Sequence, residues 1–318
     1  MARRPGGIDP EQSLAIRAAW LHYAGGLTQA AVAKRLGVPS VKAHRLIARA
    51  VAEGVVKVSI DGEIVECARL EDRLCARYGL DFCEVAPDLG EEGLPLRALG
   101  LAGASFLRRQ IESGEHEVIG LGHGRTLAAA VQQMPRFDAH HARFVSLLGG
   151  LTRNYAANPH DVMHRLAEKT GARAFVLPVP FFANSEEDRA VLLAQPGVRE
   201  IFDLSNGATL KFAGMGTVDA SAQLVASGMI EPQEIAEINA AGAVGEMMGH
   251  FFDAEGRVLE TMLSTRTLSA DLDGPPEARI VVIAGGAEKV AAIRAVLNSG
   301  RLNGLITDEL TAQALVGG

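Results

Sequence analysis

The sequence has 318 residues, which is long for one typical domain, so two domains are the first expectation. Hydrophobic residues make up 48% and charged residues 22%, as is usual for a globular protein with a substantial core, and no apolar run approaches the length of a membrane span. The net charge of −7 is uneven: residues 1–60 hold nine basic and three acidic residues, a balance of +6, and the remainder carries −13. A small basic module on a larger acidic body favours a nucleic-acid contact confined to one end.

The N-terminal segment and the cysteines point to the cytoplasm. MARRPGGIDPEQ begins with basic residues but has no apolar core behind them, unlike a signal peptide. The cysteines Cys67, Cys75 and Cys83 are eight apart, match no zinc spacing and contain no CxxC pair, which suits a reducing compartment. We therefore expect a cytoplasmic protein with no membrane partner.

The basic end of the chain predicts three short helices. Residues 13–24 form a supporting helix, Thr28 is a good N-cap for a second helix, and Gly37 ends it. Ser40 then lies where it could cap a third helix. The residues of the third helix that we expect to be buried are Val41, Leu46, Ile47, Ala50 and Val51. Two short helices joined by a glycine turn, the second one basic, form the helix-turn-helix arrangement.

In that arrangement the N-terminal part of the second helix contacts the edges of the bases. The basic residues that flank this part contact the DNA phosphates. The residues expected near bases are Ser40, Lys42, Ala43 and His44. Those expected on the DNA backbone are Arg45 and Arg49, and Gln29 is a candidate for a phosphate or base contact. The alternative is a helical bundle with a solvated basic face, but turn, caps and charge sign all agree with DNA binding. The segment VVKVSI, residues 55–60, predicts a short strand or wing.

The body of the chain alternates apolar strands with amphipathic helices. A helix over residues 67–79 leads into it. The predicted strands are residues 117–122, 143–150, 173–180, 210–216 and 279–286, and the predicted helices between them are residues 125–134, 159–171, 227–242 and 287–300. This alternation implies an α/β, Rossmann-like fold with a parallel sheet covered on both faces. Ligands of such sheets bind outside the carboxyl ends of the strands, where Gly122, Gly149 and Gly150 lie, so we expect one shared pocket.

Two of the strand-end turns carry a cation. In GHGRT, free N–H groups, the Thr126 hydroxyl and the Arg125 guanidinium can all contact phosphate oxygens. In GGAEK, Lys289 lies in the first turn of a helix, where it opposes the helix dipole unless a bound anion offsets it. Each glycine turn alone is more typical of close strand-to-helix packing. The two together favour a phosphate-bearing ligand.

Other groupings of polar residues are weaker. HDVMH places His160 and His164 one helical turn apart, but Asp161 replaces the glutamate of a zinc protease and no third ligand is evident. GEMMGHFFD could bring Glu246, His250 and Asp253 together, and there we favour a ligand hydroxyl contact from Asp253 over a metal site. No Walker A, GxSxG or HExxH motif is present, so we expect no metal, cofactor or catalytic residue.

The order of several motifs resembles the SorC-type bacterial transcriptional regulators over nearly the whole chain from about residue 12. The motifs that carry the resemblance are GLTQAAVAKRLGVPSVKAHRLIARAVAEGVV, IGLGHGRTL, VSLLGGL, LPVPF, GMGTVD, GEMMGHFFDAEG and GGAEKVAAIRAVL with GLITDELTAQAL. The resemblance implies a helix-turn-helix domain joined to an effector domain with the fold of sugar-phosphate isomerases and deaminases. It also implies a sugar effector, usually phosphorylated, operator DNA as partner, and a dimer or tetramer. The general pattern is most similar to the repressors of erythritol catabolism.

Site residues follow from the resemblance one at a time. Gly124, Arg125 and Thr126 match the phosphate loop, Lys289 matches the lysine of the last glycine turn, and Asp253 matches the acidic position that contacts sugar hydroxyls. Many members have tryptophan where this chain has His123, which suggests a different sandwiching of the ligand or a smaller or more polar effector.

The sequence is compatible with two functions. The favoured one is a regulator, a repressor of a sugar or polyol operon, with a DNA-binding domain at residues 1–62 and an effector and oligomerisation domain at residues 63–318. The alternative is a sugar-phosphate isomerase or deaminase with a basic appendage. The related deaminases carry a histidine base where this chain has GMGTVDASAQL, which contains no histidine, and Asp219 is the only substitute there. The loop at Arg125 is therefore expected to detect a phosphate without processing it.

Overall fold

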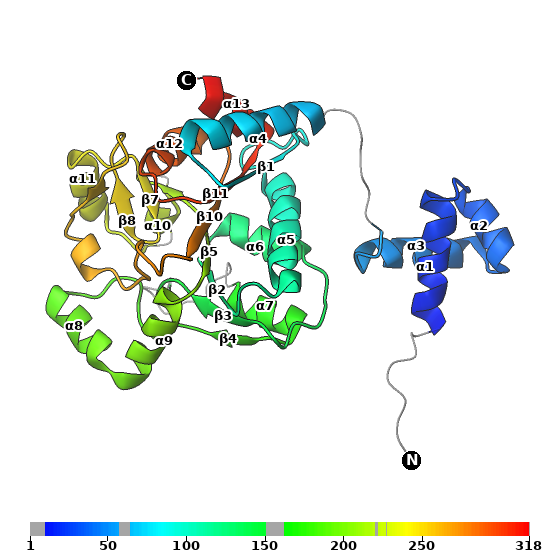
Figure 1. Cartoon of the computed structure of the whole chain (residues 1–318), viewed down its shortest axis with the longest axis horizontal. Coiled ribbons are helices and arrows are strands. Elements are labelled where there is room, and N and C mark those ends of the chain that lie inside the picture. The colour runs from blue at the N-terminus through cyan, green and yellow to red at the C-terminus, as the bar shows by residue number, and fades with distance from the viewer. Residues whose placement is uncertain (1–9, 57–63, 151–161, 220–221, 227, 318) are drawn as a thin grey trace, which may run out of the picture. The chain divides into compact units, whose positions relative to one another are not determined.

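The computed structural model describes residues 10–56, 64–150, 162–219, 222–226 and 228–317. The chain divides into two compact units, Met1–Asp61 and Gly62–Gly318, and each is described by itself (Figure 1). Among the described helices, none has the length and apolar character that crossing a membrane requires.

The N-terminal unit is a bundle of three helices. They are α1 (Pro10–Tyr23), α2 (Gln29–Leu36) and α3 (Ser40–Ala52). The Thr28 hydroxyl accepts the Ala31 N–H and caps α2, and Gly37 ends that helix in the left-handed region at φ 65°. Ala18 of α1, Val32 of α2 and Ala43 of α3 meet in the fully buried core. The predicted helix-turn-helix is therefore present, with α3 as its second helix.

Three details of α3 differ from the prediction. Ser40 is the first residue of the helix and caps nothing, because Pro39 occupies the N-cap position. Val41 and Val51 are exposed, by 74% and 45%, although both were expected in the core. A helix has one buried face, and here it is taken by residues spaced three or four apart: Ala43, Leu46, Ile47 and Ala50. The predicted strand or wing at residues 55–60 lies mostly outside the described residues.

The C-terminal unit is built on a seven-stranded sheet in the order β1-β11-β10-β5-β2-β3-β4. Its strands are β1 (Phe82–Ala86), β2 (Val118–Leu121), β3 (Arg143–Ser146), β4 (Arg173–Phe175), β5 (Leu210–Ala213), β10 (Arg279–Ile283) and β11 (Gly304–Asp308). Every neighbouring pair is parallel. The predicted Rossmann-like α/β class is confirmed, and the five predicted strands all begin at or within a residue of a real one.

Helices cover both faces of this sheet. They are α4 (Ile64–Tyr78), α5 (Leu96–Ser113), α6 (Arg125–Gln133), α7 (Met163–Thr170), α9 (Pro196–Asn206), α12 (Val290–Asn298) and α13 (Glu309–Gly317). Helix α8 (Glu186–Ala194) packs on α9. Side chains alternate along β10: Ile280 and Val282 join the core cluster under α4, α12 and α13, whereas Val281 and Ile283 join the cluster under α5, α6 and α7. Figure 1 shows α5 beside α6 on one side and α4 beside α13 on the other. This two-faced burial explains why the strands are continuous apolar runs.

A second, smaller sheet is antiparallel and was not predicted. It runs in the order β6-β7-β8-β9 through β6 (Gly216–Thr217), β7 (Gly245–Met247), β8 (His250–Phe252) and β9 (Val258–Leu259). Around it lie α10 (Gln223–Ala226), α11 (Pro232–Ala240) and the short 3₁₀ turn η1 (Ser264–Arg266). Sequence reasoning also missed β1, α5 and β11. A second 3₁₀ turn, η2 (Ala287–Lys289), leads directly into α12.

Candidate functional site

The sheet has a switch point between β2 and β5. From β2 the chain proceeds to β3 and β4 on one side, whereas β5, β10 and β11 lie on the other. The loops that follow β2, β5 and β10 therefore leave the same edge of the sheet and face one another, as in other doubly wound folds that bind ligands. They surround a pocket whose empty space, counted together with the part that opens to solvent, is about 900 Å³. Its lining residues are Gly122–Leu127, Leu148, Phe181, Ala213–Thr217, Leu224, Glu246, Met248, Glu288 and Lys289.

The pocket brings together the two cations that the sequence singled out. Arg125 is the first residue of α6, and Lys289 is the last residue of η2. The Lys289 ammonium donates to the Met215 carbonyl at 2.9 Å. Burial lowers the pKa of Lys289, and the positive charge of Arg125 lowers it further. A lysine whose positive charge is disfavoured by burial and by a neighbouring arginine is an arrangement that suits an anion.

The backbone at the start of α6 adds hydrogen-bond donors. Gly124 precedes the helix with φ 125° and ψ 170°, a conformation that only glycine adopts at low cost. The N–H groups of Arg125, Thr126 and Leu127 have no partner within the helix, because the first N–H groups of any α-helix have none. Thr126 is 5% exposed, so its side chain is nearly enclosed by the protein.

The second glycine turn is used differently. The Gly286 N–H donates to Asp308 Oδ2 at 3.1 Å and to Thr311 Oγ1 at 2.8 Å. A Cβ on Gly285 would lie 2.0 Å from the Asp308 carboxylate, so that glycine is required for close packing. This turn therefore positions Lys289 at the pocket, and its Gly286 N–H is already satisfied by the protein.

A carboxyl group faces these cations. Glu246, in the middle of β7, is buried and lines the pocket. Its Oε1 accepts the Gly249 N–H at 2.5 Å. Burial raises the pKa of Glu246 to about 7, although the Gly249 N–H and Lys289 both act to lower it. Near neutral pH this group can accept a hydrogen bond from a ligand hydroxyl as a carboxylate, or donate one as an acid.

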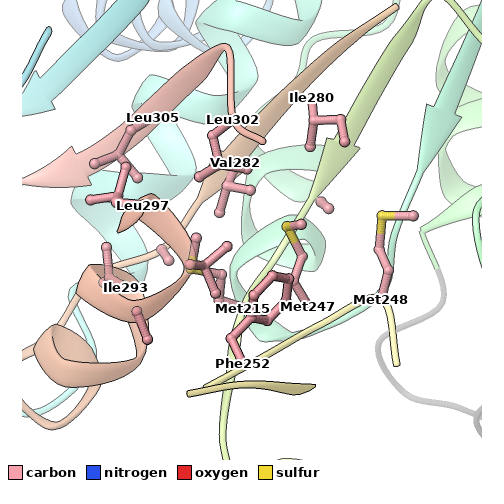
Figure 2. Packing of buried hydrophobic residues seen from close by; sticks show 14 of the residues in the cluster. Met215, Met247, Met248, Phe252, Ile280, Val282, Ile293, Leu297, Leu302 and Leu305 are labelled. Carbon is pink, nitrogen blue, oxygen red and sulfur yellow. The ribbon is translucent and has the colours of Figure 1, made fainter. Parts of the chain in front are cut away.

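The remaining wall of the pocket is apolar. Met215 and Met248 line it and also belong to the core cluster beneath α12. Figure 2 shows Met215 and Met247 grouped with Phe252, near the helix that carries Ile293. A small set of polar groups against a buried apolar wall is the usual composition of a small-molecule site.

Several predicted ligand contacts lie elsewhere. Gly149 packs against the Pro180 carbonyl, where a Cβ would come within 2.3 Å, and neither Gly149 nor Gly150 lines the pocket. Asp253 closes the turn after β8: its carboxylate accepts the Arg257 backbone N–H at 2.8 Å and the Arg257 guanidinium at 2.7 Å. The Arg257 guanidinium lowers the pKa of the Asp253 carboxyl. Asp253 is thus a turn residue, and the carboxyl groups that line the pocket are those of Glu246 and Glu288.

The other histidine and acid candidates are not gathered into a site. Asp219 is exposed and does not line the pocket, and His164 is exposed on α7. His160 lies outside the described residues. Within the described part of the chain, no cluster of three histidine, cysteine or acidic side chains could hold a metal ion. His123 lines the pocket beside Arg125, as expected.

The predicted DNA-contacting residues divide into three groups. Those exposed on the N-terminal unit are Gln29, Ser40, Lys42, His44 and Arg45. Ala43 is fully buried between the helices, so the expectation that it lies near bases is wrong. Arg49 makes an ion pair with Glu53 at 2.6 Å and another with Glu11 at 3.3 Å, so its charge is largely engaged inside the unit.

Known proteins resemble this chain in both sequence and fold. Residues 62–317 match the sugar-binding domain family Sugar-bind. The erythritol catabolism regulatory protein EryD of Brucella abortus is 68% identical over 309 residues, 97% of this chain and 98% of that protein. The transcriptional regulator LsrR of Klebsiella pneumoniae is 31% identical over 312 residues, 96% of this chain and 93% of that protein. The crystal structure of the full-length sorbitol operon regulator SorC of Klebsiella pneumoniae superposes with a TM-score of 0.76 at 25% identity, covering 98% of this chain and all of that one.

The chain belongs to the SorC-type family of transcriptional regulators. These relatives are regulators, so the alternative of an isomerase or deaminase is set aside. The described part of the loop after β5 contains no histidine.

Arg45→Ala and Arg49→Ala are expected to differ in their effect on DNA binding. Loss of the exposed Arg45 should weaken binding at all sequences and flatten the slope of log affinity against log salt by about one. Loss of Arg49 should leave that slope nearly unchanged, because its guanidinium pairs with Glu11 and Glu53. Fluorescence anisotropy over a salt series checks both. Equal affinity of Arg45→Ala and wild type at every salt concentration would show that α3 does not face the DNA.

Glu246→Gln is expected to change how the stability of the unliganded regulator depends on pH. A folded-state pKa of about 7, above the ordinary 4.5, means that Glu246 contributes most stability below pH 4.5 and that this contribution is lost as the pH rises through 7. The amide can still accept the Gly249 N–H but does not ionise. Thermal unfolding should show the variant gaining on wild type from pH 5 to pH 8. If the unfolding temperatures of variant and wild type differ by the same amount at pH 5 and pH 8, the raised pKa of Glu246 is contradicted.

Proposed function

We propose that this regulator represses a sugar or polyol catabolic operon and responds to a small phosphorylated effector bound at the β2/β5 edge of its sheet. The observation that supports this most directly is the convergence of Arg125 and Lys289 on one pocket that also holds Glu246. The cations and the start of α6 suit a phosphate, and Glu246 suits a hydroxyl. The name of the relative EryD points to erythritol catabolism, so four-carbon polyols and their phosphates are the first effectors to test.

The size of the effector's influence on DNA binding is limited by linkage. The effector changes DNA occupancy only if it binds one conformation of the regulator more tightly than another, and the shift is limited by that difference. We propose that the regulator acts in the cytoplasm as a homodimer or homotetramer, which would present its α3 helices in pairs. Symmetric half-sites about one helical turn apart, or a multiple of that spacing, suit such an arrangement.

The residue assignments follow from the same geometry. Arg125, Thr126, Gly124 and Gly122 are proposed to hold the phosphate together with Lys289, and His123 is proposed to lie beside the bound effector. On the N-terminal unit, Gln29, Ser40, Lys42, His44 and Arg45 are proposed to contact operator DNA.

The proposal is tested by thermal shift with free erythritol, erythritol phosphate and inorganic phosphate. Ligand binding to the native state raises the unfolding temperature, so the phosphorylated polyol should stabilise the wild type most. Arg125→Ala and Lys289→Met should each weaken its binding by about tenfold or more, since a hydrogen bond to a charged group contributes about 1.5–3 kcal/mol.

The control is Arg165→Ala, which removes an exposed arginine of α7 that does not line the pocket. It should leave the shift unchanged. Equal stabilisation by free and phosphorylated polyol, unaffected by the Arg125 and Lys289 variants, would overturn the phosphate assignment.

A further inference from the structure

The first turn of α3 exposes an apolar side chain that the core does not use. Val41 is 74% exposed, the highest value among the exposed large hydrophobic residues that the structure describes. Valine is a poor choice there on two grounds. A β-branched side chain loses rotamer freedom in a helix, and its methyl groups remain in water.

The helical period explains why Val41 is outside. The core face of α3 is formed by Ala43, Leu46, Ile47 and Ala50. Val41 lies two residues before Ala43, which turns it away from that face. Residues three and four positions further along a helix share its face, and for Val41 these are the exposed His44 and Arg45.

The charge around Val41 indicates what covers it. Lys42 and Arg45 are exposed on the same turns, and residues 1–60 carry a balance of +6. A polyanion fits that surface better than an apolar protein partner does. In a helix-turn-helix the first residues of the second helix enter the major groove, where the thymine 5-methyl group is the apolar feature of the base edges.

We propose that Val41 reads thymine by packing its methyl groups against a thymine 5-methyl in each operator half-site. The inference rests on the proposed DNA-binding function and adds a specificity-determining residue to it. The Val41 side chain supplies no hydrogen bond and no charge. Its contribution is therefore confined to discrimination between a base with the methyl group and the same base without it.

The test uses a duplex selected from a random pool by wild-type full-length protein. Each thymine of a half-site is replaced in turn by uracil, which removes only the 5-methyl group. Wild type should lose affinity about fourfold at one position per half-site, the equivalent of about 0.8 kcal/mol for one buried methyl-sized group. Val41→Ala should bind the thymine and uracil duplexes equally well, measured by fluorescence anisotropy.

Val51→Ala is the matched control, because Val51 is also an exposed valine of α3 but lies at its far end. This variant should keep the wild-type preference for thymine. The proposal is overturned if wild type ignores every uracil substitution, or if Val41→Ala still distinguishes the two bases. It is also overturned if Val41→Ala, compared with wild type, loses the same factor of affinity for the thymine and the uracil duplex. Val41 would then act through contacts within the protein and not through the thymine methyl group. A wild type that selects no duplex at all would instead refute the DNA-binding function itself.

Discussion

The repulsion between two half-buried cations is the constraint on which the proposed effector site depends. Arg125 and Lys289 come from loops more than 150 residues apart in the chain, and burial in a shared pocket lowers the pKa of Lys289. A charge removed from water is costly unless an opposite charge or good hydrogen bonds compensate it. Within the protein, Glu288, Glu246 and the Met215 carbonyl supply part of that compensation for Lys289. The proposed anionic effector would supply more, so its binding energy would derive from a pocket whose cations are costly to the protein on its own.

The parallel sheet makes that arrangement possible. Because β2, β5 and β10 run in the same direction, the turns after them meet at one edge, and the change of direction at β2 and β5 opens the space between them. The glycines keep the loops close to the sheet: Gly122 lies against Ala213, and Gly286 is held by Asp308 and Thr311. The Asp308 carboxylate also accepts the Thr311 N–H at 3.0 Å at the start of α13. One side chain at the end of β11 thus fixes both the helix α13 and the turn that presents Lys289.

The sequence predicted the features that follow from a local pattern of residues. It did not predict the features that depend on which strands pair with each other. Apolar runs ending in glycine turns predict parallel strands, and strand ends predict that Arg125 and Lys289 meet. By contrast, Glu246 and Asp253 both flank apolar residues, so the sequence does not distinguish their positions. Only the antiparallel pairing of β7 with β8 shows that Glu246 reaches the pocket and that Asp253 closes a turn. Helix α5 was missed because its glycines mimic a loop. A Cβ on Gly103 would lie 2.5 Å from Ile283, so the glycine serves close packing inside a helix.

The two binding surfaces of the regulator use positive charge in physically different ways. Lys42 and Arg45 are exposed, so salt screens them and DNA binding gains from released counterions. Lys289 is largely buried with Arg125 beside it, where salt screens little and each hydrogen bond to an anion is stronger. If these residues bind as proposed, affinity for DNA should vary steeply with ionic strength, whereas affinity for the effector should vary much less. On that proposal, the response of the regulator to its effector is insensitive to the ionic conditions that govern its binding to DNA.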